Sequence, residues 1–126
     1  MSAELIEQAR VFVARHRERQ AQIEAALEVA RELPVEQNYV IVIAGLAMKF
    51  EIVGNSVRNP ARGRTEAVQR FTAEQAQHVA PQVQNGLGER GQALPLVRAL
   101  EEELAGVLSN IEVFEGAIAR MQAEQE

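Results

Sequence analysis

The side chains that could carry chemistry are few in this sequence. It holds two histidines, His16 and His78, and no cysteine, which excludes disulfides, thiolate metal ligands and cysteine nucleophiles. Glu74 and His78 have the spacing of neighbours on one helix face, but metal sites in helical proteins need further inward-facing histidines or carboxylates. We therefore predict no metal site and no cofactor.

The motifs of catalysis are also missing. No serine or threonine lies in a G-x-S-x-G or S-x-x-K motif, and the glycine-rich stretch NGLGERG at residues 85–91 lacks the lysine and spacing of a phosphate-binding loop. We predict no catalytic residue, no small-molecule substrate and a protein that is not an enzyme. Acid–base chemistry by glutamates stays open, because burial can raise the pKa of a carboxylate.

One segment is rich in arginine. Guanidinium groups can bind phosphate, and Thr65 could cap a helix whose N-terminus also favours anions. Nucleic-acid or anion binding is nevertheless the alternative function, because the segment has no interleaved aromatic residues and the net charge of the chain is -5. Its residues are Arg58, Arg62, Arg64 and Arg70.

The elements that would position any site are predicted to be helices. All 18 acidic residues are glutamates, and alanine, glutamine, arginine and leucine are frequent, a composition typical of helices. The C-terminal third carries an apolar seam whose members follow one another at spacings of three and four residues, which predicts a long helix packed along its length as in a coiled coil. The seam consists of Val97, Leu100, Leu104, Val107, Ile111, Phe114, Ile118 and Met121.

A second long helix is predicted over residues 3–33, where no glycine or proline interrupts the chain. Its apolar stripe includes Leu5, Phe12 and Ile23, but His16 and Arg19 fall within the same stripe. An unpaired charge in a closed seam is costly. This stretch is therefore predicted either to be met by acidic side chains of a partner or, as we favour, to be partly exposed.

The apolar stretch YVIVIAGLAM at residues 39–48 is ambiguous between helix and strand. It is too short to span a membrane as a helix. We favour a buried central helix, because a strand would need a partner and no second β-rich segment stands out, so that strand pairing would require another copy of the protein. Gly54 and Asn55 would end this helix, and residues 56–64 would form a loop.

The remaining segments complete an all-α prediction. A third helix is expected over residues 66–80, followed by a glycine-rich connection and a last helix from about residue 94. The predicted fold is an elongated bundle of about four helices in a single domain, residues 1–126. Its long N- and C-terminal helices are antiparallel, and the apolar central helix is buried.

The predicted function is a non-catalytic helical interaction module that acts through its heptad seams. It would bind itself, most simply as a two-fold homodimer, or another protein, in the manner of an adaptor, chaperone or inhibitor. The N-terminal sequence has no basic and apolar leader, so a cytoplasmic location is expected, although export without a cleaved signal stays open. The strong preference for arginine over lysine suggests a bacterial or phage source.

Overall fold

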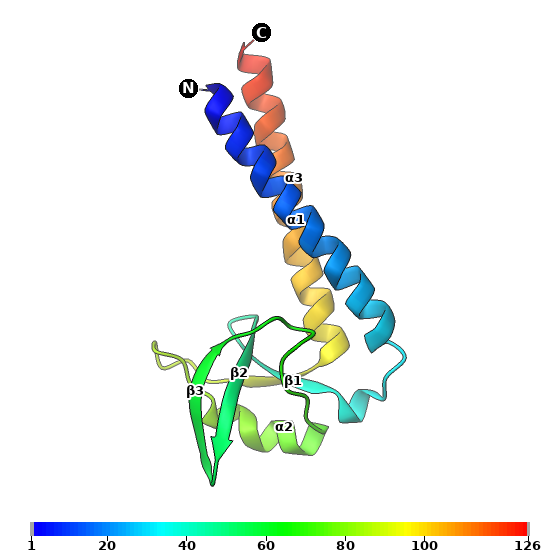
Figure 1. The fold of residues 1–126 in the computed structure, drawn as a ribbon, viewed down its shortest axis with the longest axis vertical. Coiled ribbons are helices and arrows are strands. Elements are labelled where there is room, and N and C mark those ends of the chain that lie inside the picture. The colour runs from blue at the N-terminus through cyan, green and yellow to red at the C-terminus, as the bar shows by residue number, and fades with distance from the viewer. Residues whose placement is uncertain (1, 126) are drawn as a thin grey trace. The chain divides into compact units, whose positions relative to one another are not determined.

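The computed structural model describes residues 2–125 and combines helices with a sheet (Figure 1). The prediction of an all-α helical bundle is wrong, and so is the description of the chain as a coiled coil. Four strands form an antiparallel sheet in the order β3-β2-β1-β4. The elements are α1 (Ser2–Ala30), η1 (Val35–Gln37), β1 (Tyr39–Ile43), β2 (Leu46–Val53), β3 (Ser56–Arg62), α2 (Ala73–Val79), η2 (Ala80–Gln82), β4 (Gln92–Pro95) and α3 (Leu96–Gln125).

The apolar stretch predicted to be a buried central helix forms strands instead. Ala44 and Gly45 divide it into β1 and the beginning of β2. Both residues have positive φ, 51° and 78°, the pattern of a type I′ turn, which joins two strands directly. The partner that a strand requires comes from this same chain, because β1 pairs with β2 on one side and with β4 on the other.

The segment predicted to be a loop after residue 55 is the edge strand β3. Gly54 has a φ of 61° and begins a two-residue turn that leads from Val53 to Ser56. A β-bulge then places two residues of β3, Asn59 and Pro60, against Phe50 alone. An edge strand and a bulge are the positions where a sheet tolerates proline, which has no N–H to donate.

A glutamine side chain takes the place of a missing strand beside Phe50. The amide oxygen of Gln69 accepts a hydrogen bond from the Phe50 N–H at 3.2 Å, and its amide nitrogen donates to the Phe50 carbonyl. The pairing of β1 with β2 ends at Ala47, so β1 offers no partner at this point. Gln69 therefore satisfies backbone groups that the short strand β1 does not reach.

The third predicted helix is shorter than expected and begins later, at Ala73. Thr72 is its N-cap: the Thr72 hydroxyl accepts from the Gln75 N–H, and the Gln75 side chain accepts from the Thr72 N–H. This reciprocal pair is a capping box, which fixes the start of a helix. The last helix also begins later, because Gln92–Pro95 pair with β1 before α3 starts.

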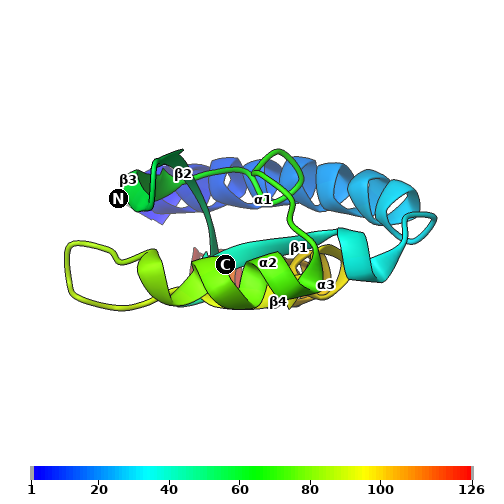
Figure 2. The same ribbon diagram turned by 90° about the horizontal axis from the view of Figure 1, so that it is seen from below.

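One face of the sheet packs against α2 and η2 to form an apolar core (Figure 2). Ile41 and Ile43 of β1 lie on this face, as the alternation of side chains along a strand requires. The buried members of this core are Ile41, Ile43, Met48, Phe50, Ala76, Ala80 and Val83. The short helix α2 is thus held by the sheet it covers.

Residue contacts divide the chain into two compact units. The helix-pair unit consists of the described residues within 1–25 and 103–126, and the sheet unit consists of residues 26–102. Helices α1 and α3 pass from one unit into the other without a break. The prediction that residues 1–126 form a single domain stays a prediction.

Candidate functional site

In the helix-pair unit, α1 and α3 run antiparallel and side by side (Figure 1). The rings of Phe12 and Phe114 lie 4.1 Å apart between centroids. The Arg19 guanidinium lies 2.9 Å from the Glu103 carboxylate. Residue numbers therefore rise along α1 as they fall along α3, which fixes the register of the pair.

The buried line of α1 contains Ile6, Ala9, Val13 and Ile23 within the helix-pair unit. On α3 the corresponding buried residues are Val107 and Ile111, 8% and 5% exposed. Spacings of three and four residues keep such side chains on one stripe of a helix. Each helix thus uses a narrow apolar stripe to cover the other.

The predicted seam residues are buried to very different degrees. On α3, Leu100 is fully buried, whereas five of the other predicted members are only partly buried: Val97, Leu104, Phe114, Ile118 and Met121. On α1, Ile23 is fully buried, Phe12 is partly buried and Leu5 is 55% exposed. Whether the exposed parts of these side chains contact a second molecule stays a prediction.

Four of the accessible seam residues, Leu5, Phe12, Phe114 and Met121, lie on one face of the helix pair together with a polar network. Leu5, Phe12 and Arg19 recur every seven residues on α1, which places them on one side of its buried line. On α3, Phe114 and Met121 continue the heptad of the buried Val107, and the contact of Phe114 with Phe12 places them beside the α1 residues. We call this surface the Phe12–Phe114 face; it comprises Leu5, Phe12, Arg19, Glu103, Phe114 and Met121.

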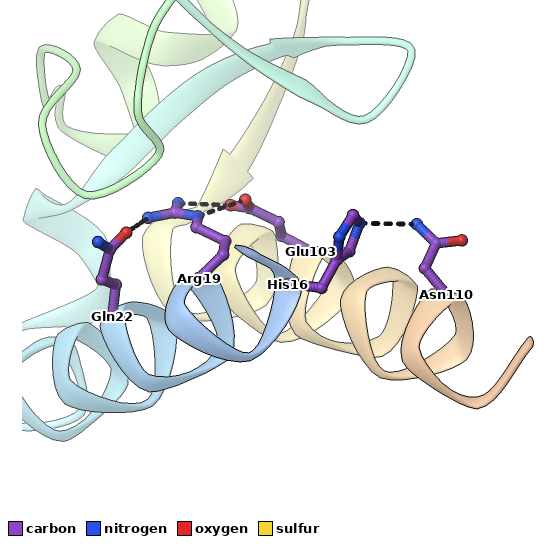
Figure 3. A network of polar contacts seen from close by, with 5 residues as sticks. All are labelled: His16, Arg19, Gln22, Glu103 and Asn110. Atoms are coloured by element: carbon purple, nitrogen blue, oxygen red, sulfur yellow. Dashed lines mark hydrogen bonds and ion pairs between the residues drawn. The ribbon is translucent and has the colours of Figure 1, made fainter. Parts of the chain in front are cut away.

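The polar end of this face is closely paired (Figure 3). Arg19 Nε and Nη2 donate to the two carboxylate oxygens of Glu103 at 2.9 and 3.0 Å, a bidentate pair, and Nη1 donates to Gln22 Oε1 at 3.3 Å. The side chains of Arg19 and Glu103 are 20% and 28% exposed. They form a defined ion pair that solvent still reaches.

His16 joins the aromatic and the charged parts of the face. Its ring stacks on Phe12 with centroids 4.1 Å apart. Since the Phe12 carbonyl can only accept, the Nδ1–H of His16 donates to it at 3.0 Å, and Nε2 then accepts from Asn110 Nδ2 at 3.4 Å. The polar residues within the predicted stripe are thus met by side chains of α3.

This intrachain pairing was not predicted from the sequence. Acidic side chains of a partner, or solvent, were expected opposite Arg19, but Glu103 of the same chain lies there. The signal that could have revealed it is the antiparallel order of the helices, which brings the middle of one stripe opposite the middle of the other. Identifying the particular glutamate would have required the register.

The opposite flank of the helix pair carries a different ion pair. Arg17 Nη2 donates to Glu115 Oε2 at 2.9 Å, and both side chains are about half exposed, 53% and 49%. Val13 and Ile118 lie beside it in a shallow groove. This flank provides matched controls for experiments on the Phe12–Phe114 face.

The basic segment does not form one cluster. Arg58 and Arg62 belong to β3, where they stand opposite Glu51 and Met48 of β2. Cross-strand partners share a face of the sheet, and positions 48 and 51 of one strand point to opposite faces, so these two arginines do as well. Arg64 is exposed beyond the end of β3, and Arg70 donates to the Glu66 carbonyl at 2.8 Å.

The candidate metal ligands give no constellation in the described part of the chain. No group of three or more His, Cys, Asp or Glu side chains there could hold a metal ion. Glu74 and His78 both lie on α2 and are exposed. Among residues 3–125, every buried side-chain nitrogen and oxygen has a hydrogen-bond partner.

Comparison with known proteins assigns no family to the chain. It matches no protein-family model, no curated protein and no solved structure. Among residues 2–125, none of the helices combines the length and the apolar character that a membrane span requires.

Proposed function

We propose that this chain is a non-catalytic protein-interaction module that acts through its helix pair. One observation carries the proposal: α1 covers the centre of the α3 seam, but the Phe12–Phe114 face keeps apolar and aromatic side chains accessible. Val107 and Ile111 are less than a tenth exposed, whereas Leu5 is 55% exposed and Phe12 and Phe114 are only partly buried.

The free energy of burying apolar surface favours a protein as the ligand of this face. Burial of apolar surface contributes about 25 cal/mol per Å², whereas an exposed ion pair contributes about 0–1 kcal/mol. Aromatic residues and arginine are also the types that most often anchor protein interfaces. Phe12, Phe114 and Arg19 supply both on one surface.

The alternative of nucleic-acid or anion binding has less support. The strand register separates Arg58 from Arg62, so no single basic surface gathers the four arginines. We propose a cytoplasmic location together with the interaction function, which fractionation of the native cells tests.

Photo-crosslinking in the cells that produce the protein tests the interaction function. A benzoylphenylalanine in place of Leu5 should form adducts with a protein, either a second copy or a different chain. The same probe in place of Glu18, which is exposed and lies on the side of α1 away from the buried line, is the control. No protein adduct at position 5, or equal adducts at both positions, would contradict the proposal.

A further inference from the structure

We propose that the partner of the Phe12–Phe114 face is the same face of a second copy. The two helix pairs lie parallel, so that α1 of each copy packs against α3 of the other. The inference rests on the proposed function and names its partner. It follows from the order of side chains along the face, which makes the face complementary to itself.

The face is arranged in layers across the helix pair, and each layer takes one residue from each helix. Phe12 meets Phe114 in the aromatic layer, and Arg19 meets Glu103 in the charged layer. Between them lies the hydrogen-bonded pair of His16 and Asn110 (Figure 3). Extending the register of the aromatic layer by one heptad places Leu5 opposite Met121 as an apolar end layer.

This arrangement gives each layer a matching partner in a second copy. A two-fold axis parallel to the helices places the α1 member of every layer against the α3 member of the same layer. Arg19 of one copy then approaches Glu103 of the other, and Phe12 approaches Phe114. The charged layer becomes four alternating charges, and the aromatic layer becomes four rings in one apolar cluster.

The opposite orientation lacks this match. If the copies were fully overlapped but antiparallel, the apolar end layer of one would cover the charged layer of the other. Residues 5 and 19 are about 21 Å apart along α1 at 1.5 Å per residue, so a small shift cannot bring the layers back together. Covering the Arg19–Glu103 pair with leucine and methionine would remove water from two charges without supplying new partners.

Two single variants and their mixture test the charged layer directly. Arg19→Glu gives a face with two acids, and Glu103→Arg gives a face with two bases. Each variant alone opposes like charges in a homodimer and should weaken dimerisation by about 100-fold or more. An equimolar mixture opposes two acids to two bases, so sedimentation should recover a heterodimer with the mass of two chains.

The control uses the other flank. Arg17→Glu and Glu115→Arg break an ion pair of the same composition outside the face. Both should dimerise as the unaltered chain does, singly and when mixed. Far-ultraviolet circular dichroism of all four variants checks that helix content is retained.

A second pair of variants keeps the test valid if the charged variants lose their fold. Leu5 is 55% exposed and Leu108, one heptad before Glu115 on the other flank, is 43% exposed, so both tolerate a polar side chain. Leu5→Glu should weaken the dimer by about tenfold or more, because the glutamate enters the apolar end layer. Leu108→Glu should leave the dimer unchanged.

Three results would overturn the inference: a chain that stays monomeric at about millimolar concentration, a mixture of Arg19→Glu with Glu103→Arg that stays monomeric while both are folded, or equal effects of Leu5→Glu and Leu108→Glu. These outcomes are distinct from failure of the proposed function. A monomeric chain that still gives adducts from position 5 to a different protein would retain the interaction function and reject the second copy.

Discussion

Gly91 is a position where the sheet unit has no room for a side chain. A Cβ at this residue would lie 2.6 Å from Ile41 Cγ2 and 2.7 Å from the Ala80 carbonyl oxygen. Ile41 is 1% exposed and belongs to the core beneath α2, so it cannot move aside freely. Gly91→Ala should therefore lower the free energy of unfolding by about 1–3 kcal/mol, as overpacking of a core does, measured by urea denaturation.

Gly86 supplies the matched control for this substitution. It lies in the same glycine-rich connection, but a Cβ there has nothing within 4 Å. Gly86→Ala should leave stability unchanged or raise it by up to about 1 kcal/mol, because it restricts the unfolded chain. Equal losses of stability in the two variants would show that the lack of space beside Ile41 of β1 is not what disfavours alanine at position 91.

The β1–β2 hairpin contains a local conflict between sequence and backbone. Ala44 has a φ of 51°, in the left-handed region that costs an L-residue with a Cβ about 1–2 kcal/mol. A type I′ turn favours Asn-Gly, and Gly45 already occupies the second position. Ala44→Asn should therefore raise the thermal midpoint and add about 0.5–1 kcal/mol to the free energy of unfolding.

Ala61→Asn tests whether asparagine itself is responsible for the gain. Ala61 is an exposed residue of β3, and its φ is not positive. Asparagine is disfavoured in strands, so this variant should be neutral or slightly less stable. An equal gain at both positions would contradict the turn argument.

The sequence predicts the two long helices well and the strands poorly. The long helices at both ends lie over segments where apolar residues repeat with helical spacing for many turns. The strands were not predicted because residues 39–43 are apolar throughout and therefore lack the alternation of apolar and polar residues that marks a strand. The informative signals lay next to them: the alternation of Met48, Phe50 and Ile52 with charged residues, and the Gly54–Asn55 dipeptide between two strands.

The sequence also predicts only part of the candidate site. A spacing of three and four residues identifies the stripe of α3, but it does not say which side chains stand opposite. The pairing of Arg19 with Glu103 joins residues 84 positions apart in the sequence. The spacing of apolar residues within one helix does not determine its register against a helix so distant in the sequence.

At the scale of the whole molecule, α1 and α3 are the only elements that contribute to both units of the described chain. Their buried stripe includes Ile23 and Ile111 in the helix-pair unit and Leu27 and Leu100 in the sheet unit. Stability that depends on this stripe should therefore be sensitive to a charge placed on it. It should be insensitive to the same charge on an outer face.

Ile111→Glu and Val113→Glu make this comparison within one turn of α3. Ile111 is 5% exposed and Val113 is 60% exposed. A glutamate at position 111 is buried without a partner and should cost about 3–5 kcal/mol, whereas the exposed change should stay within about 0.5 kcal/mol. Urea denaturation, monitored by the circular dichroism signal of the helices, measures the free energy of unfolding of both variants. If the two variants lose equal stability, Ile111 of α3 does not pack against α1 in solution. The Phe12–Phe114 face, which depends on the same register of α3 against α1, is then also wrong.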